Sequence, residues 1–393
     1  MDPRPNRPIY LDNQATTACD PRVVQAMLPW FTENFGNPHS AEHVMGRQAE
    51  AAVEAARAEV AALIGAQARE VVFTSGATES NNIAIKGAAR HAARYGDSTR
   101  RRIITVATEH KCVLESVADT AREGFEPVVL TVRPDGTLDP ELLSAALAVP
   151  TLLVSVMGVN NETGVIQDIA TLAGIARGRG ALFHCDAAQG VGKIPLDVER
   201  MGIDLLSLSG HKIYGPKGIG ALYVRRRPRV RLEALFSGGG QERGLRAGTL
   251  PAPLIIGLGE ACRIALAEME QEAARIRALR DRLLATLQEG IPGVSVNGSM
   301  NARVPGNLNL TFPRADAAAL MKAVPELCVS TGSACSSAEV EPSYVLRALG
   351  LDDAAASRTL RFGIGRFTSP AEIDLAAALL IEAHVAASAP IEA

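Results

Sequence analysis

Residues 206–220, "LSLSGHKIYGPKGIG", decide the fold because a small polar turn joins two short apolar runs at this point. The full runs, Ile203–Ser209 and Ile219–Val224, are rich in branched side chains and bounded by glycine, which predicts two strands. Lys212 lies in the turn between them. A lysine at a strand end can project into an interior cleft, whereas an ordinary turn lysine keeps its amine in solvent. The turn taken alone favours the solvated alternative, so the rest of the chain must decide.

Helical and strand patterns alternate along the chain before this segment. The predicted elements, in chain order, are a helix over 41–65, a strand over 70–76, a helix over 77–96 and strands over 102–110, 151–164 and 181–189. Strands that alternate with helices are typical of an α/β fold whose sheet is mainly parallel. We therefore expect a large α/β domain of this kind.

Polar residues follow each predicted strand. The polar strand ends are Thr74–Thr78, Glu109–His110, Asn160–Asn161, Asp186–Gln189 and Ser209–Lys212. In open α/β sheets, ligands bind at the carboxyl ends of the strands. The sequence therefore predicts that these groups converge on one binding site.

The pattern changes from about Cys262 onward. A long charged helix is predicted to run to Gly290, and shorter apolar segments and a last helix over 370–387 follow it. This order is typical of a second, smaller α+β domain. No segment rich in proline or serine separates the two parts as independent modules.

The composition narrows the class of protein. The chain has 393 residues, of which 47% are hydrophobic and 21% charged, as in an ordinary globular protein. Its 40 basic and 43 acidic residues leave a formal net charge of −3, so we expect no direct binding of nucleic acid or membrane. The apolar stretches are shorter than a bilayer span and the N-terminus resembles no targeting segment, so a cytoplasmic location is expected. The six cysteines are scattered, and we expect no structural disulfides.

The strand-end groups suggest a phosphorylated ligand. In "FTSGATESNN", residues 73–82, a glycine turn enters a helix, so backbone N–H groups can hold an anion such as phosphate, although an ordinary helix cap would also explain the pattern. Ser209 and His211 would add donors beside Lys212. Asp186 ends a predicted buried strand, where it could pair with a protonated ring nitrogen or cap the following turn. Together with His110 and the strand-end lysine, these elements describe pyridoxal 5′-phosphate.

Three other motifs carry less information. Adjacent His184, Cys185 and Asp186 cannot all bind one metal ion, because neighbouring strand residues point to opposite faces. The sequence "GVGK" ending at Lys193 lacks the first glycine and the trailing hydroxyl residue of a phosphate-binding P-loop. The basic run over 225–231 is interpreted as a solvated strand exit, with a docking patch for an acidic partner as the alternative.

The order of the motifs identifies a family. The motifs are "YLDNQATT" (10–17), "FGNPHS" (35–40), "FTSGATESNN" (73–82), "TEHKCVLES" (108–116), "VNNETGVIQDI" (159–169), "HCDAAQGVGKIPLDV" (184–198), "SGHKIYGPKGIGALYVRR" (209–226), "GGGQERGLRAGT" (238–249), "STGSACSSAEVEPSYVLRALG" (330–350) and "LRFGIGRF" (360–367). In this order they resemble the cysteine desulfurases of the IscS/NifS class, within the fold type I, aminotransferase class V family of pyridoxal-phosphate enzymes. The resemblance extends from Ile9 to about Ala387. It implies a large domain of residues 15–261 and a small domain of residues 1–14 plus 262–393.

The resemblance implies a role for each matching residue. Lys212 resembles the Schiff-base lysine, and Cys335 resembles the nucleophile that accepts sulfur. The remaining matches are Asp186 with the ring nitrogen, Gln189 with the ring hydroxyl, His110 with the stacked ring that assists proton transfer, Ala77, Thr78, Ser209 and His211 with the phosphate cradle, and Asn161 and Arg361 with the substrate. Thr249 resembles a phosphate contact that the family supplies from the second subunit, which implies a homodimer. Cys328 is interpreted instead as a packed core residue.

The implied reaction converts L-cysteine to L-alanine and leaves the sulfur on Cys335 as a persulfide for iron–sulfur cluster assembly and other thio-cofactors. Small residues around Cys335 predict a mobile loop. The implied partners are sulfur-acceptor proteins such as an iron–sulfur scaffold, although the docking tail of housekeeping members is expected to be absent. The alternatives are a selenocysteine lyase, another class V enzyme such as an aminotransferase, or a non-catalytic partner-binding subunit. The catalytic residues argue against the last, and a mobile thiol has no use in transamination.

Overall fold

A seven-stranded sheet forms the larger part of the molecule. The computed structural model describes residues 7–97, 99–331 and 342–388. The strand order is β2-β8-β7-β6-β5-β3-β4. The strands are β2 (Val71–Thr74), β3 (Arg102–Val106), β4 (Glu126–Leu130), β5 (Thr151–Ser155), β6 (Leu182–Asp186), β7 (Leu205–Ser209) and β8 (Gly220–Val224). Only β8 among these strands runs antiparallel to its neighbours, so the expectation of a mainly parallel α/β sheet is confirmed.

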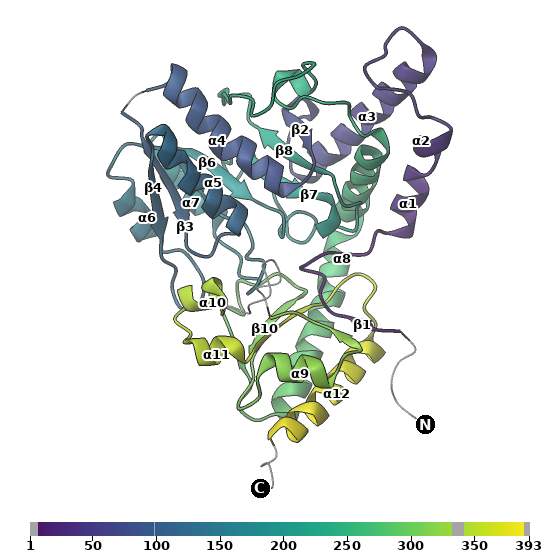
Figure 1. Ribbon diagram of the computed structural model, residues 1–393, viewed down its shortest axis with the longest axis vertical. Helices are drawn as coiled ribbons and strands as arrows, with labels where there is room; N and C mark the ends of the chain where they lie inside the picture. The colour runs from purple at the N-terminus through teal and green to yellow at the C-terminus, as the bar shows by residue number, and fades with distance from the viewer. Residues whose placement is uncertain (1–6, 98, 332–341, 389–393) are drawn as a thin grey trace.

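Helices cover both faces of this sheet (Figure 1). Alternation along β2 shows why: Val71 and Phe73 belong to one hydrophobic cluster, and Val72 belongs to another on the opposite face. The helices of this part are α1 (Pro21–Met27), α2 (Pro29–Thr32), α3 (Val44–Leu63), α4 (Ala77–Tyr95), α5 (Lys111–Asp119), α6 (Pro140–Ala146) and α7 (Ile169–Gly178), with short 3-10 turns at Ala68–Glu70, Thr120–Glu123, Gly210–Lys212 and Glu242–Gly244. Burial of the central strands on both sides explains their near-continuous apolar sequences, whereas the edge strand β4 is partly exposed.

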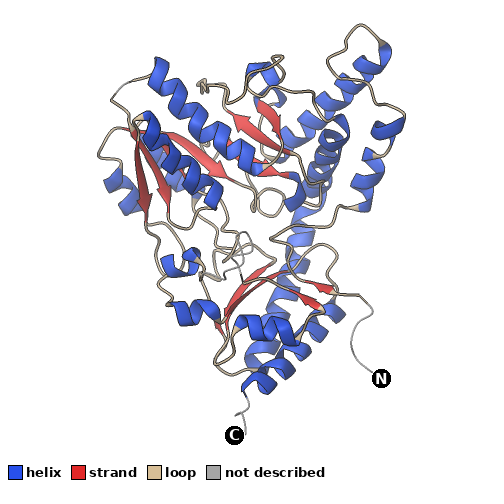
Figure 2. Cartoon of the chain, in the orientation of Figure 1, coloured by secondary structure: helices blue, strands red, loops and turns tan. Residues whose placement is uncertain are grey.

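A second, smaller sheet lies below the first in Figure 2, where its strands are drawn as red arrows. Its antiparallel order is β12-β10-β9, and β1 pairs in parallel with β11 beside it. The elements of this part are β1 (Ile9–Tyr10), β9 (Ser295–Val296), β10 (Asn307–Thr311), β11 (Leu327–Cys328), β12 (Thr359–Gly363), α9 (Ala317–Ala323), α10 (Tyr344–Ala348), α11 (Asp353–Ser357) and α12 (Pro370–Ser388). This sheet and α12 share a separate hydrophobic cluster.

Helix α8 (Ala252–Gly290) joins the two parts. Its 39 residues extend about 58 Å, and Figure 1 shows it running from the large sheet into the smaller part. Its buried hydrophobic side chains up to Ala265 belong to the first cluster, and those from Ile276 belong to the second. The helix begins nine residues before the predicted start at residue 261, because the apolar segment 252–260 packs against α3 and α1. The domain division at 261/262 stays a prediction, since α8 passes through it without interruption.

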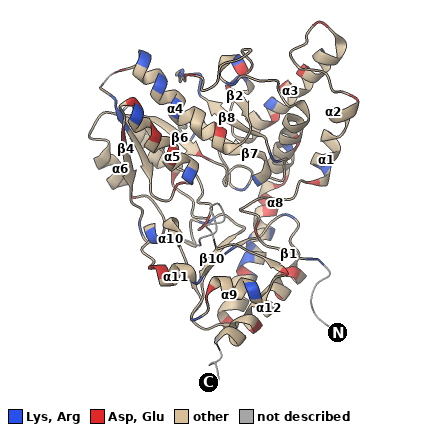
Figure 3. Cartoon of the chain, in the orientation of Figure 1, with Lys and Arg blue, Asp and Glu red and all other residues tan. Residues whose placement is uncertain are grey.

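Charged residues of both signs are spread over the helices (Figure 3). The basic run 225–231 is only partly solvated, which corrects the sequence interpretation. Arg225 is buried, lies 3.5 Å from the Asp204 carboxylate and donates a hydrogen bond to the Val198 carbonyl at 3.2 Å. Arg226 and Arg229 are exposed as expected. Among the described residues, no helix is both long and apolar enough to cross a membrane.

Candidate active site

A cavity of about 550 Å³ lies at the carboxyl ends of the central strands. Its lining combines segments that follow β2, β3, β5, β6 and β7 with residues 14–16 and with Arg361 of β12. The predicted site residues that line it are Ala77, Thr78, His110, Asn161, Asp186, Gln189, Ser209, His211, Lys212 and Arg361. The sheet therefore brings these strand ends together. Glu109 and Asn160 are not among the lining residues, although they follow the same strands.

Lys212 ends the 3-10 turn that follows β7. Its Nζ donates hydrogen bonds to the Gln14 carbonyl at 2.6 Å and the Ala15 carbonyl at 2.7 Å, and its side chain lines the cavity. A hydrogen bond from Gly210 N to Ile219 O at 2.9 Å joins the start of this turn to the residue that precedes β8. The interior interpretation of Lys212 therefore holds, and the solvated alternative is wrong.

Asp186 ends β6 and is buried. Its Oδ2 accepts a hydrogen bond from Asn81 Nδ2 at 2.7 Å, and its Oδ1 accepts one from Ala188 N at 2.9 Å. One oxygen therefore caps the following turn, and the other is oriented by a side chain of α4. Both interpretations of Asp186 from the sequence are compatible with this geometry, because capping occupies only one oxygen.

His110 caps the start of α5 with its ring. Its Nδ1 accepts a hydrogen bond from Cys112 N at 3.2 Å and lies 3.0 Å from Cys112 Sγ. Burial lowers the pKa of His110, and the nearby Lys212 adds to this, although Asp186 opposes it. The ring is therefore neutral near neutral pH. Since Nδ1 accepts from the backbone, the proton of the neutral ring lies on Nε2.

Complete burial also raises the pKa of Glu109 well above its ordinary value, with a further contribution from the Asp186 carboxylate. Glu109 is therefore a fully buried carboxyl beneath the site rather than a cavity residue. Asn160 is likewise occupied elsewhere, since its Oδ1 caps the turn by accepting from Glu162 N and Thr163 N at 2.9 and 2.8 Å.

The anion cradle lies where α4 begins. Gly76 precedes the helix with φ of +149°, a backbone conformation that favours glycine, and the first backbone N–H groups of α4 open onto the cavity. Ser209 and His211 flank the same region. Burial lowers the pKa of His211 to about 4, and Lys212 and Lys217 contribute, so its ring is a neutral donor or acceptor.

Arg361, on β12 of the smaller part, also lines the cavity. Its Nη1 donates to the Asn161 carbonyl at 3.0 Å, and its Nη2 donates to Asp12 Oδ1 at 2.8 Å. Arg361 Nε and Asn161 Oδ1 are buried without a hydrogen-bond partner among the described residues. Buried polar atoms without partners are costly, so these two mark a place for the polar groups of a ligand.

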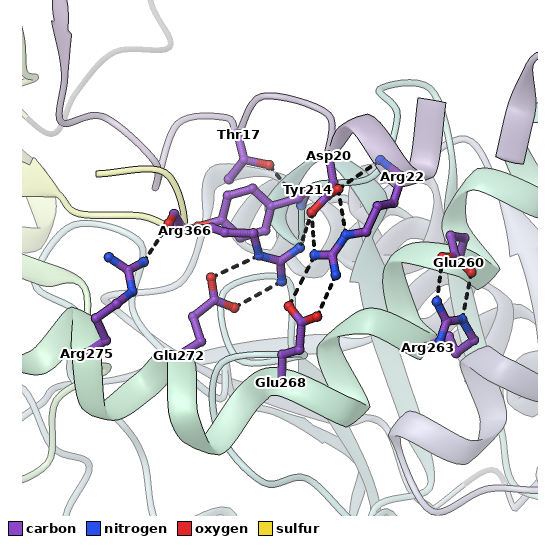
Figure 4. A network of polar contacts seen from close by, with 10 residues as sticks. All are labelled: Thr17, Asp20, Arg22, Tyr214, Glu260, Arg263, Glu268, Glu272, Arg275 and Arg366. Atoms are coloured by element: carbon purple, nitrogen blue, oxygen red, sulfur yellow. Dashed lines mark hydrogen bonds and ion pairs between the residues drawn. The ribbon is translucent and has the colours of Figure 1, made fainter. Parts of the chain in front are cut away.

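A network of ion pairs and hydrogen bonds centred on Arg366 lies near the lysine turn (Figure 4). Arg366 follows β12; it donates to Asp20 Oδ2 at 2.8 Å and to both carboxylate oxygens of Glu272 at 3.0 Å. Its guanidinium lies 4.3 Å from the centre of the Tyr214 ring, and its backbone N–H donates to the Tyr214 hydroxyl at 2.6 Å. Tyr214, two residues after Lys212, has a left-handed φ of 63°. The network therefore joins the lysine turn, β12 and α8.

The family model described as "Aminotransferase class-V" matches residues 9–375. The chain belongs to this family.

Among similar members, the protein named cysteine desulfurase IscS from Rickettsia bellii is 54% identical over 373 residues, which cover 95% of this chain and 90% of that protein. The cysteine desulfurase from Homo sapiens is 55% identical over 368 residues, covering 94% and 80% respectively. A solved structure titled "NIFS-LIKE PROTEIN" superposes with a TM-score of 0.87 at 34% identity and covers 96% of this chain and 99% of its own. DndA from Streptomyces lividans gives 0.76 at 47% identity, covering 91% and 99%. The expected fold type and family are confirmed.

The cofactor of this class V protein is pyridoxal 5′-phosphate. The residues of the cavity fit it: Lys212 for the aldehyde, the Asp186 carboxylate for the ring nitrogen, and the amino end of α4 for the phosphate. The ring hydroxyl has the side-chain amide of Gln189 available, whose Nε2 donates to the Gln14 carbonyl at 2.8 Å. These individual roles are proposals that the geometry supports.

The predictions for Cys335, Thr249 and Cys328 differ in how far the structure bears on them. Cys335 lies outside the described residues. Thr249 is exposed on the surface and is not among the residues that line the cavity of its own chain. Cys328 is only half-buried, so its interpretation as a core residue is wrong. Strand alternation explains this, because Leu327 and Val329 are the inward-facing residues of β11 and its extension.

Several site residues were not singled out from the sequence. They are Gln14, Ala15, Thr16, Cys112 and Lys217, which line the cavity, and Asn81, which orients Asp186. Backbone carbonyls such as those of residues 14 and 15 leave no mark in a sequence. Asn81 did leave a signal, since a small polar side chain occupies the buried face of the α4 pattern.

Proposed function

We propose that this protein is a cysteine desulfurase that takes sulfur from L-cysteine and releases L-alanine. The observation that carries the proposal is the convergence of Lys212, Asp186 and Arg361 on one cavity. When bound, the cofactor supplies an electron sink beside the substrate carbon that loses its proton. Relatives named cysteine desulfurase cover nearly the whole chain and support the same reaction.

Each residue has a proposed task. Arg361 holds the substrate carboxylate, because a buried guanidinium with an unpartnered Nε can add a charge-assisted hydrogen bond. Lys212 anchors the cofactor and, when released by the substrate amine, moves the substrate proton at Nζ. The neutral His110 ring covers the cofactor face and can exchange a proton at Nε2. Asp186 stabilises the protonated ring nitrogen.

Cys335 is the proposed sulfur acceptor. Its thiolate attacks the substrate sulfur, the bond between sulfur and the β-carbon breaks, and the electron pair of that bond takes up a proton to complete alanine. The transferred sulfur remains on Cys335 as a persulfide. An external thiol reductant or a sulfur-acceptor protein, such as an iron–sulfur scaffold, then removes it.

We also propose a homodimer in which Thr249 reaches the phosphate of the partner site. The segment that carries Thr249 is firmly anchored to its own subunit. Glu242 accepts hydrogen bonds from Arg57 Nη1 and Nη2 at 2.7 and 2.8 Å and from Phe73 N at 2.7 Å. Arg246 pairs with Glu79 at 3.0 Å, next to the cradle. These contacts fix the segment from Glu242 to Arg246 in place, and Thr249 just after it is exposed. Thr249 is therefore suited to contact a second subunit.

The test is to incubate the protein, loaded with pyridoxal 5′-phosphate, with L-cysteine and a thiol reductant, and to measure alanine and sulfide together. Equal amounts of both are expected. Cys335→Ser should bind cofactor and cysteine yet release almost no alanine, because a serine oxygen cannot accept sulfur as a persulfide. Cys328→Ser is the matched control and should stay active. Full alanine release by Cys335→Ser, or a 2-oxo acid as the main product, would contradict the proposal.

A further inference from the structure

Lys193 is a half-buried lysine that the proposed mechanism does not use. It lies in the turn that follows β6, and its Nζ donates a hydrogen bond to Gln189 Oε1 at 3.0 Å. Burial, with a smaller contribution from Lys212, lowers the pKa of Lys193 to about 7. A turn lysine would usually extend its amine into water, so the hydrogen bond of Lys193 to a glutamine of the cavity wall calls for an explanation.

Lys212 also lines a second, smaller cavity. Its volume is about 40 Å³, enough for one or two water molecules. Lys193 lines it together with Lys212, Tyr214, Glu272 and Arg366. Glu272 and Arg366 already pair with each other at 3.0 Å. The hydrogen bond that Lys193 does make is directed instead toward Gln189, at the wall of the larger cavity.

The contacts of Gln189 form a continuous chain to the reactive lysine. Its Oε1 accepts from Lys193, and its Nε2 donates to the Gln14 carbonyl at 2.8 Å. The same carbonyl accepts from Lys212 Nζ at 2.6 Å. If the amide were turned over, its NH₂ group would face the Lys193 amine and its oxygen would face the Gln14 carbonyl. The two neighbours therefore allow one amide orientation.

We infer that Lys193 is a positioning residue that holds the Gln189 amide with its nitrogen toward the ring hydroxyl of the cofactor. Nε2 has two hydrogens, of which the Gln14 carbonyl takes one, so the other is available to the cavity. Without Lys193, the Gln14 carbonyl is the one remaining contact among the described residues that orients the amide, so the amide is held less firmly in this orientation. The inference rests on the proposed function, since it assigns the cofactor to this cavity.

The test is a double-mutant cycle on the binding of pyridoxal 5′-phosphate to the full-length apoprotein. Lys193→Met removes the donor but keeps an unbranched side chain only one atom shorter, and Gln189→Leu removes the amide. Each is expected to weaken binding about tenfold, as for loss of one buried hydrogen bond. Their combination should weaken it no further than either change alone. Lys322→Met, at an exposed position of α9, is the control and should leave affinity unchanged.

The visible absorbance of the bound cofactor supplies a second measurement, because a hydrogen bond to the ring hydroxyl alters the electronic state of the ring. Lys193→Met and Gln189→Leu should shift the pH dependence of this absorbance in the same way. Additive losses of affinity would overturn the inference. So would a lower thermal midpoint combined with unchanged affinity and absorbance, which would assign Lys193 a structural role. Lys193→Leu serves as the second variant if Lys193→Met does not fold.

These outcomes separate the two proposals. Failure of the wild-type apoprotein to bind the cofactor would remove the proposed function and the role of Lys193 with it. Normal wild-type binding with unchanged Lys193→Met binding would remove only the role of Lys193. No turnover of L-cysteine enters either measurement.

Discussion

Replacement of Arg366 by methionine tests whether the ion-pair network in Figure 4 holds the site together. The Arg366 side chain is 8% exposed, and its carboxylate partners Asp20 and Glu272 are 2% and 12% exposed. Removal of one member of a buried pair leaves the other charge without compensation, which costs about 3–5 kcal/mol. Asp20 keeps the two side-chain hydrogen bonds from Arg22, at 3.0 and 2.9 Å, and one from its backbone N–H at 3.0 Å, so Glu272 is the main uncompensated group. We therefore expect Arg366→Met to lower the free energy of unfolding by about 3 kcal/mol, at the lower end of this range.

The matched control is Arg282→Met. Arg282 binds Asp374 with two hydrogen bonds of 2.6 Å, but both side chains are about half exposed, at 53% and 48%. An exposed pair of the same chemistry contributes about 0–1 kcal/mol. The difference between the two variants in free energy of unfolding therefore measures the effect of burying the ion pair.

The assay is urea unfolding at one fixed protein concentration, followed by circular dichroism, together with the alanine assay. Arg366→Met should also reduce alanine formation, because the Arg366 guanidinium packs over the ring of Tyr214, two residues after Lys212. A loss of stability below about 1 kcal/mol, or one equal to that of Arg282→Met, would refute the argument from burial.

Three further outcomes are expected. Lys212→Ala should lose the borohydride-reducible link to pyridoxal 5′-phosphate, and a reducible lysine adduct in this variant would remove Lys212 from its role. Mixed Lys212→Ala and Thr249→Ala subunits should regain part of the activity, because both lesions then fall in one composite site; a fully active monomer in sedimentation would contradict this. Burial lowers the pKa of His184 to about 3, so the folded state excludes a proton that the unfolded chain binds below about pH 6.5. Stability should therefore fall as the pH drops from 6.5 toward 3, by about 4 kcal/mol in total, and His184→Gln should flatten that slope whereas the exposed His39→Gln should not.

Much of the fold could be predicted because local patterns and global packing agree. Strand β7, with its sequence "LLSLS", is buried at every residue, as a parallel central strand should be. The predicted strands were too long at their carboxyl ends: β3 stops at Val106, and the polar residues through His110 form the loop and the cap of α5. The physical cause is that the loop residues between a strand and the binding site do not alternate between buried and exposed, so the sequence pattern does not mark where the strand ends.

The start of α8 was missed for the opposite reason. Residues 252–260 are apolar nearly all round, since they pack between α3 and α1, so they show no amphipathic stripe. The half-buried position of Cys328 was missed because a two-residue strand is too short to reveal which face is covered.

The sequence by itself determined the order of the elements, the family, and which side chains gather at the strand ends, because periodicity and motif chemistry are local properties. Only the tertiary structure decided what those side chains touch. Lys212 is held by carbonyls of Gln14 and Ala15, nearly two hundred positions earlier in the chain, and Asp186 of β6 is held by Asn81 of helix α4. Such contacts depend on the distance between backbones that the whole sheet sets. Backbone carbonyls are identical in every residue, so no reading of side chains along the chain could have selected them.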